Sequence, residues 1–175
     1  RRKENEKKLY LLYDQMYWTL TYGNTRHYNP VALNPEMKDY TIYIDGISKA
    51  LASTGVRVGW ALGPQKVLNK MRSINSHVGA WSPMAEQHAT AAFLKEDDEM
   101  DAHLSHFRSE LQERLQKIYD GFQQLKKEGY DVDTCKPEAA IYMAIKINLT
   151  GKKTSDGNVL QTQQDVTAYI LNEAK

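Results

Sequence analysis

Three short apolar segments limit the folds that this sequence can adopt. Each is rich in β-branched or aromatic side chains and is closed by Asp, Gly or Pro. The segments are residues 9–13, 40–44 and 56–62. Apolar runs of this length between turn-forming residues are typical of buried strands, such as those of a parallel sheet. Because loops and helical patterns separate them, the sequence predicts an α/β fold with a mostly parallel sheet.

One long helix is predicted after these strands. Apolar side chains recur at helical spacings of three and four from Met100 to Leu125. The segment begins with acidic residues and ends with lysines, which suits the helix dipole, and Gly129 is a suitable C-cap. A coiled coil is the alternative, but a repeat of roughly four heptads is the shortest that supports one. Residues 139–147, which follow, have the pattern of a strand.

Shorter patterns fill the rest of the chain. Residues 22–35 are predicted to be loop, because Pro30 and Pro35 interrupt a helix. Polar residues 151–164 are predicted to be a loop or an insert. Helical patterns start at Gln65 and cover residues 84–94 and 166–174.

The composition excludes several classes of protein. The 23 Lys and Arg nearly cancel the 22 Asp and Glu, which argues against a protein that binds nucleic acid or a membrane surface by charge. No apolar run approaches the roughly 18–20 residues of a membrane helix. The single cysteine, Cys135, fits a reducing compartment, so we expect a cytoplasmic protein. The chain starts at Arg1 rather than Met and ends within a helical pattern, so we expect a fragment.

A lysine and an arginine follow the second predicted strand. Lys49 is expected at the carboxyl end of that strand, the edge at which α/β folds bind ligands. Small residues such as Ser48 flank it, so backbone and ligand can approach closely. Arg57 is expected on the third strand, on the same face as Gly59, where its guanidinium can bind a phosphate. Taken alone, Lys49 has the ordinary alternative of a surface lysine.

A second pair follows the first predicted strand. That strand ends at Asp14, and Tyr17 comes three positions later. If the chain turns helically after Asp14, the two side chains share one side. The alternative for this pair is a helix cap beside a packed tyrosine.

Together these residues resemble the class I/II aminotransferases, pyridoxal 5′-phosphate (PLP) enzymes of fold type I with the aspartate aminotransferase fold. The family has Asp-x-x-Tyr after one strand, here Asp14 to Tyr17, and a lysine flanked by small residues after the next, here Lys49. Gly-x-Arg-x-Gly follows, here residues 55–59. These motifs are specific as a set, although none is specific alone.

The resemblance, which covers residues 9–94 and more faintly 137–147, implies two partial domains. Residues 1–97 would be the later half of the PLP-binding large domain, and residues 98–175 the long connecting helix and part of a small α+β domain. The parent would be a homodimer that exchanges an amino group between an amino acid, such as aspartate, and a 2-oxo acid. The alternatives are a carbon–sulfur lyase or an aminocyclopropane-carboxylate-type synthase of the same fold, and a non-catalytic module built on the long helix.

The resemblance also implies roles for the matching residues. Lys49 would bond PLP through its amine and move the substrate proton. Asp14 would hold the protonated pyridine nitrogen, and Tyr17 the phenolic oxygen. Arg57 would bind the phosphate, with the Ser48 hydroxyl as a weaker ligand.

The sequence departs from the family pattern in the site. Some relatives have a phosphate-binding serine three positions before the lysine, where this chain has Gly46. The family's phosphate loop, its ring-stacking aromatic residue and an asparagine are expected before Arg1. The arginine that binds the substrate carboxylate is expected after Lys175.

Other polar residues have weaker claims to a site. His103 and His106 have a spacing that suits a metal, but no third ligand is evident, so solvated side chains are favoured and no metal site is predicted. Cys135 is either a reactive thiol or incidental. His77 and Trp81 lie where the family approaches its dimer interface and the cofactor phosphate.

We predict that the isolated chain of 175 residues binds PLP weakly and does not transaminate, because the expected phosphate loop and substrate-binding arginine lie outside it. A PLP titration and an assay for 2-oxo acid formation check this. Turnover by the isolated chain would contradict the prediction.

Overall fold

The computed structural model describes residues 7–173. The described chain divides into two compact units after Glu110, and Glu138–Ala140 return to the first unit. The domain boundary predicted at residue 97 stays a prediction. Each unit is considered by itself below.

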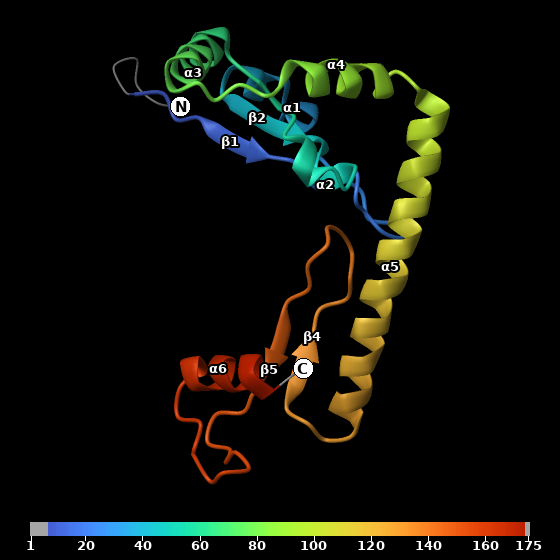
Figure 1. Cartoon of the computed structure of the whole chain (residues 1–175), viewed down its shortest axis with the longest axis vertical. Coiled ribbons are helices and arrows are strands. Elements are labelled where there is room, and N and C mark those ends of the chain that lie inside the picture. The colour runs from blue at the N-terminus through green and yellow to red at the C-terminus, as the bar shows by residue number, and fades with distance from the viewer. Residues whose placement is uncertain (1–6, 174–175) are drawn as a thin grey trace. The chain divides into compact units, whose positions relative to one another are not determined.

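The first unit contains a mixed sheet of three strands in the order β1-β2-β3. Figure 1 shows β1 and β2. Strand β1 (Leu11–Asp14) pairs in parallel with β2 (Thr41–Gly46), from Leu11 opposite Thr41 to Asp14 opposite Ile44. Strand β3 (Gly59–Leu62) pairs antiparallel with β2. The three predicted strands are confirmed, and β2 is the central one.

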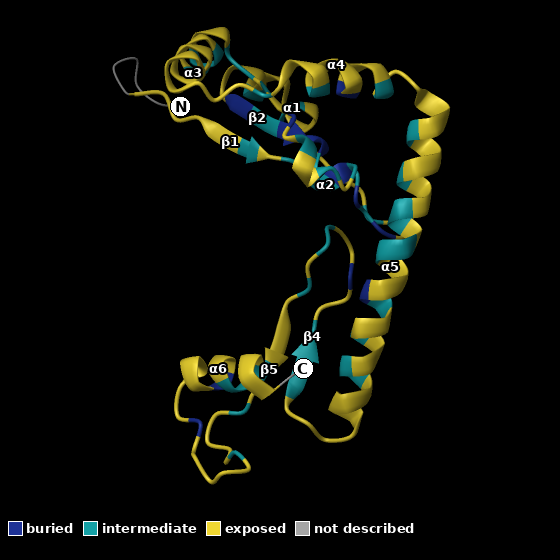
Figure 2. Cartoon of the chain, viewed as in Figure 1, coloured by how far each residue is buried: buried dark blue, intermediate teal, exposed yellow. Residues whose placement is uncertain are grey.

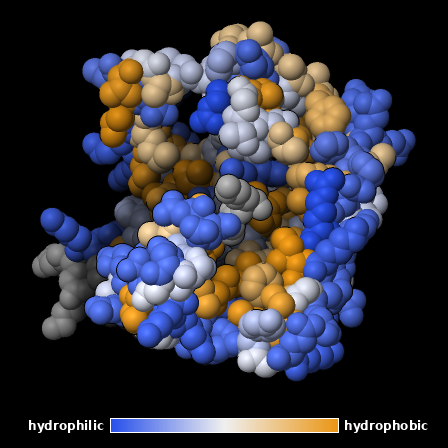
Figure 3. Space-filling model, turned by 60° about the horizontal axis from the view of Figure 1, so that its bottom comes forward, coloured by the Kyte–Doolittle hydropathy of each residue, from blue (hydrophilic) through white to orange (hydrophobic). Residues whose placement is uncertain are grey.

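The predicted burial of these strands on both faces is wrong for β1. Leu12 is 66% exposed, whereas Ile42 in β2 is 9% exposed. Figure 2 shows the buried residues of the sheet gathered on β2. The reason is that β2 alone has a neighbour on each side among the described strands, while β1 and β3 form the edges. Other apolar side chains are also at the surface, as the orange areas of Figure 3 show.

The connection from β1 to β2 is not the simple loop that was predicted. It contains one helical turn, α1 (Pro30–Leu33), followed by a 3-10 turn, η1 (Pro35–Asp39). Both prolines begin a helix instead of breaking one, because proline at a first helical position lacks only an N–H that has no helical partner. Asn29 caps α1 by accepting a hydrogen bond from the Ala32 amide at 2.8 Å.

Helices follow the sheet in chain order. They are α2 (Ile47–Ala50), α3 (Gln65–Val78), α4 (Met84–Phe93) and the long α5 (Asp97–Lys127). The predicted long helix is confirmed, with acidic residues in its first turn and lysines in its last. Gly129 follows α5 with φ of 93°, a conformation that favours glycine. Among the described residues, no helix combines the length and apolar character required to cross a membrane.

The core of the first unit lies where β2 meets the turns around it. Its buried apolar residues are Leu20, Tyr22, Ile42, Ile47, Ala50 and Val58. Residues 138–140 join this core, since the Tyr22 amide donates to the Glu138 carbonyl and the Ala140 amide donates to the Leu20 carbonyl. The Tyr22 hydroxyl donates to the Ala140 carbonyl, and burial raises the pKa of Tyr22.

The second unit contains the later part of α5, a small antiparallel sheet and a last helix. Strands β4 (Val132–Thr134) and β5 (Ile145–Ile147) pair, and α6 (Gln163–Glu173) follows. Of the predicted strand 139–147, β5 forms only the end, and Ala139 makes an isolated bridge to Thr21. Hydrogen bonds from Lys146 and Asn148 lower the pKa of Asp131 beside this sheet.

Replacing Leu20 should destabilise the first unit. Leu20 is fully buried, so Leu20→Ala should lower the free energy of unfolding by about 2–5 kcal/mol through lost burial and a cavity. Leu33→Ala is the control, since Leu33 is 70% exposed. Chemical denaturation measures both, and equal effects of the two substitutions would contradict the assignment of Leu20 to the core.

Candidate functional site

Three segments meet at the carboxyl end of β2. The turn after β1 is joined there by a hydrogen bond from the Gln15 amide to the Ile44 carbonyl at 3.0 Å. The segment before β3 is joined by a hydrogen bond from the Ile47 amide to the Val58 carbonyl at 3.3 Å. The segment after β2 forms α2. These contacts bring the three predicted motifs to one end of the sheet.

The approach between these segments is close enough to require glycine at residue 46. A Cβ on Gly46 would lie 2.8 Å from the Val58 carbonyl oxygen and 2.9 Å from the Gly59 Cα. Both are backbone atoms that cannot rotate away. The side chain of Met16 covers the same position, at 3.3 Å. A serine at residue 46, as in some relatives, would therefore require the backbone to shift.

Asp14 ends β1 and is exposed, and its Oδ1 accepts a hydrogen bond from the Met16 amide at 3.2 Å. The chain then turns: the Trp18 amide donates to the Gln15 carbonyl, and the Leu20 amide to the Tyr17 carbonyl. Tyr17 is half-buried in this turn. The prediction that the first strand ends at Asp14 is confirmed, and the chain turns directly after it.

Ser48 and Lys49 lie in α2 and are both half-buried. The Leu51 amide closes the helix on the Ile47 carbonyl at 3.1 Å, and the Thr54 hydroxyl donates to the Ser48 carbonyl at 3.0 Å. Lys49 is thus held one short turn beyond the end of β2.

The predicted position of Arg57 on the third strand is wrong. Arg57 precedes β3, follows the 3-10 turn η2 (Thr54–Val56), and has the left-handed backbone conformation with φ of 62°. Its side chain is exposed, and Nη1 donates to the Thr54 carbonyl at 2.9 Å. Pairing with β2 extends only as far as Gly59, which lies opposite Gly46. The strand therefore begins at Gly59, and Arg57 lies outside it.

The predicted residues share one end of the sheet without direct bonds between their charged groups. Over residues 7–173, no hydrogen bond or ion pair joins the side chains of Asp14, Lys49 and Arg57. The arrangement leaves a carboxylate, an amine and a guanidinium on three neighbouring segments. Such a set can bind a ligand that carries a cationic nitrogen, a carbonyl group and an anion.

Sequence reasoning overlooked Asp45, which is the most extensively bonded acid at this edge. Asp45 is 5% exposed, and its carboxylate accepts hydrogen bonds from the Gly46 amide at 2.7 Å, Trp18 Nε1 at 3.0 Å and Gln15 Nε2 at 3.2 Å. In the sequence, the Asp45-Gly46 pair has the form of an ordinary turn after a strand. The signal that was available is the position of Asp45, shortly before the lysine.

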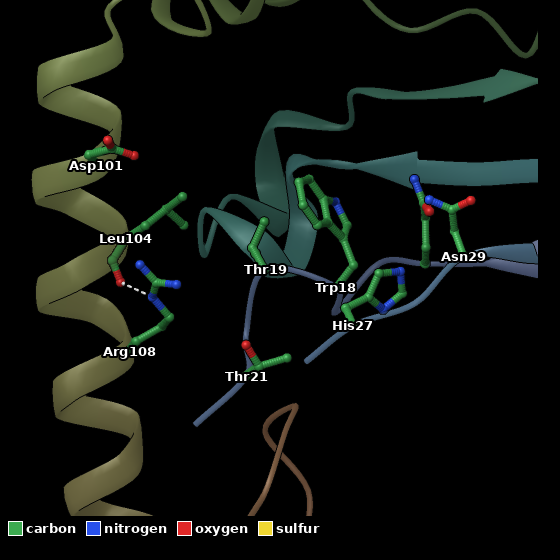
Figure 4. Close-up of a pocket in the computed structure, with 9 residues that line it drawn as sticks. Trp18, Thr19, Thr21, His27, Asn29, Asp101, Leu104 and Arg108 are labelled. Carbon is green, nitrogen blue, oxygen red and sulfur yellow. Dashed lines mark hydrogen bonds between the residues drawn. The ribbon is translucent and has the colours of Figure 1, made fainter. Parts of the chain in front are cut away.

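Two cavities adjoin this turn within the first unit. One, of about 530 Å³, lies between residues 15–29 and the first turns of α5. Figure 4 shows two of its lining residues, Leu104 and Arg108, joined by a hydrogen bond from Arg108 Nε to the Leu104 carbonyl. The other, of about 280 Å³, is lined by residues that include Asp45 and Gly46. None of the five predicted site residues lines either cavity.

The remaining candidates have local partners. The ring of His103 stacks on Phe107, and His77 Nδ1 lies 2.7 Å from the Ser73 carbonyl. His77 and Trp81 line a separate cavity of about 370 Å³. Cys135 is exposed. Among the described residues, no cluster of His, Cys, Asp and Glu has an arrangement that could hold a metal ion.

Gly46→Ala should lower the free energy of unfolding by about 1–3 kcal/mol, because its Cβ would overlap two backbone atoms. Gly55→Ala is the matched control, since a Cβ there meets nothing within 4 Å. Thermal unfolding of both variants checks the prediction. A Gly46→Ala variant as stable as the control would show that the three segments are not tightly packed.

Comparisons with known proteins find aspartate aminotransferases among the chain's relatives. The aspartate aminotransferase of Geobacillus stearothermophilus is 33% identical over 163 residues, and that of Rhizobium meliloti (strain 1021) is 30% identical over 168 residues. These matches cover 93% and 95% of this chain but only 38% and 39% of the relatives' lengths.

Solved structures match over the same extent. The crystal structure of the aspartate aminotransferase from Rhizobium meliloti superposes with a TM-score of 0.82 at 29% identity, over 94% of this chain and 40% of that one. An aromatic aminotransferase from Pyrococcus horikoshii gives a TM-score of 0.77 at 26% identity, over 95% and 40%. The sequence pattern of "Aminotransferase class I and II" matches residues 2–175, so the chain belongs to this family.

Proposed function

We propose that the whole protein containing this chain is a PLP-dependent aminotransferase that exchanges an amino group between an amino acid and a 2-oxo acid. The observation that carries the proposal is the meeting of the Asp14–Tyr17, Ser48–Lys49 and Arg57 segments at the carboxyl end of β2. Aspartate is the first candidate substrate, because several relatives are aspartate aminotransferases.

The chemistry of the donor set fits PLP. The Asp14 carboxylate can accept a hydrogen bond from a protonated pyridine nitrogen, and the Tyr17 hydroxyl can donate to a phenolic oxygen. The Arg57 guanidinium suits a phosphate, and the Ser48 hydroxyl can add a further hydrogen bond. When bound, PLP supplies the electron sink that stabilises the carbanion left by loss of the substrate α-proton.

Lys49 has two roles in this proposal. Its amine would be the group that holds the cofactor covalently. Once free, the same amine would act as the base that moves the substrate α-proton. Asp14 favours proton loss by keeping the ring nitrogen positively charged. A homodimer and a cytoplasmic location stay predictions.

Borohydride trapping tests the proposal. Reduction of the PLP-loaded whole protein, followed by peptide mass mapping, should place a pyridoxyl group on Lys49. Lys49→Ala should lose the adduct and reduce turnover by about 10²–10⁴-fold or more, because the base and the covalent attachment are both removed. Lys38→Ala, an exposed lysine in η1, is the control.

Product analysis separates an aminotransferase from the other enzymes of this fold. An aminotransferase yields 2-oxo acid and new amino acid in equal amounts, whereas a lyase or a synthase does not. Absence of an adduct on Lys49 would overturn the proposal as a whole.

A further inference from the structure

We infer that Asp45 is a positioning residue whose buried carboxylate fixes the Asp14–Tyr17 turn against the segment that carries Lys49. The inference rests on the proposed function, since the groups that it positions are those proposed to hold PLP. Asp45 is not assigned any contact with the cofactor or the substrate.

The bonding of Asp45 differs from that of an ordinary turn aspartate. Its side chain is nearly inaccessible, and its three hydrogen-bond donors are neutral: a backbone amide, an indole and a side-chain amide. Over residues 7–173, Asp45 makes no ion pair. Burial of a carboxylate is unfavourable unless hydrogen bonds replace its hydration. The three donors replace the hydration that the carboxylate loses on burial.

The positions of the donors turn this bonding into a geometric constraint. Gln15 and Trp18 occupy the two ends of the turn that follows Asp14, and both donate to the same oxygen, Oδ2 of Asp45. The residues between them are Met16 and Tyr17. A single carboxylate oxygen thus holds both ends of the turn that presents Tyr17.

The other carboxylate oxygen holds the Lys49 side of the arrangement. Oδ1 accepts the hydrogen bond of the Gly46 amide, at the residue that ends β2 and precedes α2. Lys49 is the third residue of α2. Asp45 itself belongs to the segment that leads to Lys49, and its bond to the next amide fixes the carboxylate within that segment. The link to the turn after β1 is made by Oδ2.

Packing alone does not hold the indole in place. Trp18 is 45% exposed, and both Trp18 and Asp45 line the cavity of about 280 Å³. A side chain beside open space can rotate once its hydrogen bond is lost. The hydrogen bond to Asp45 and a tilted ring contact with His27 at 6.1 Å between centroids therefore restrain the indole, while backbone hydrogen bonds close the turn itself.

Two substitutions test the inference in the whole protein. Asp45→Asn keeps the shape of the side chain but cannot accept all three hydrogen bonds, and Trp18→Phe keeps an aromatic ring but removes one donor. Asp120→Asn is the control, because Asp120 is an exposed residue of α5 that accepts from Gln116.

Three measurements read the effect: the Kd for PLP added to the apoprotein, the pH midpoint of the colour change of bound PLP, and the amide hydrogen exchange of the apoprotein. Each single variant should raise the Kd by about tenfold, the effect of losing one hydrogen bond to a charged group. The pH midpoint should shift, and exchange should accelerate in residues 14–18 and 47–51 together.

The outcomes distinguish this inference from the proposed function. If Lys49 is trapped in the wild-type protein but the variants lower only the melting temperature, with Kd and pH midpoint unchanged, Asp45 is merely structural and the inference is wrong. If the wild-type protein is not trapped at Lys49, the proposed function fails and the inference fails with it. Trp18→Phe, the milder change, keeps the test decisive if Asp45→Asn does not fold.

Discussion

The parallel pairing of β1 with β2 is the interaction on which the rest of the candidate site depends. Its register places Asp14 opposite Ile44, so both strands end at the same edge and the turn after Asp14 begins level with Asp45. A shift by one residue would reverse the faces of every side chain in β1 and move Asp14 out of reach of this edge. The register thus brings the motif that begins at Asp14 close to the segment that follows Ile44, although the two are far apart in the sequence.

The antiparallel pairing of β3 with β2 brings the third motif, which contains Arg57, to the same edge. The first residue of β3, Gly59, is paired with Gly46, and the two backbones approach so closely that a Cβ on Gly46 would lie 2.9 Å from the Gly59 Cα. Arg57 reaches the edge because it lies just before this pairing, in a turn rather than in the strand. The glycine that departs from the serine of some relatives therefore has a structural cause in this chain.

Features set by local patterns were predictable from the sequence. The length of α5 follows from apolar spacing, and the turn after Asp14 follows from the end of an apolar run. Features set by distant partners were not predictable. The exposure of β1 and the isolated bridge of Ala139 depend on which segments lie beside them, and periodicity carries no information about that.

Asp45 shows most clearly why part of the site could not be predicted. An aspartate before a glycine at the end of a strand is usually a solvated turn residue, and the sequence around Asp45 is equally compatible with that alternative. Its donors Gln15 and Trp18 become evident only when the turn after β1 is placed beside the end of β2. A reaction that moves a proton requires its groups to be held within fractions of an ångström. A buried carboxylate that bonds both segments supplies such rigidity, which a surface turn does not.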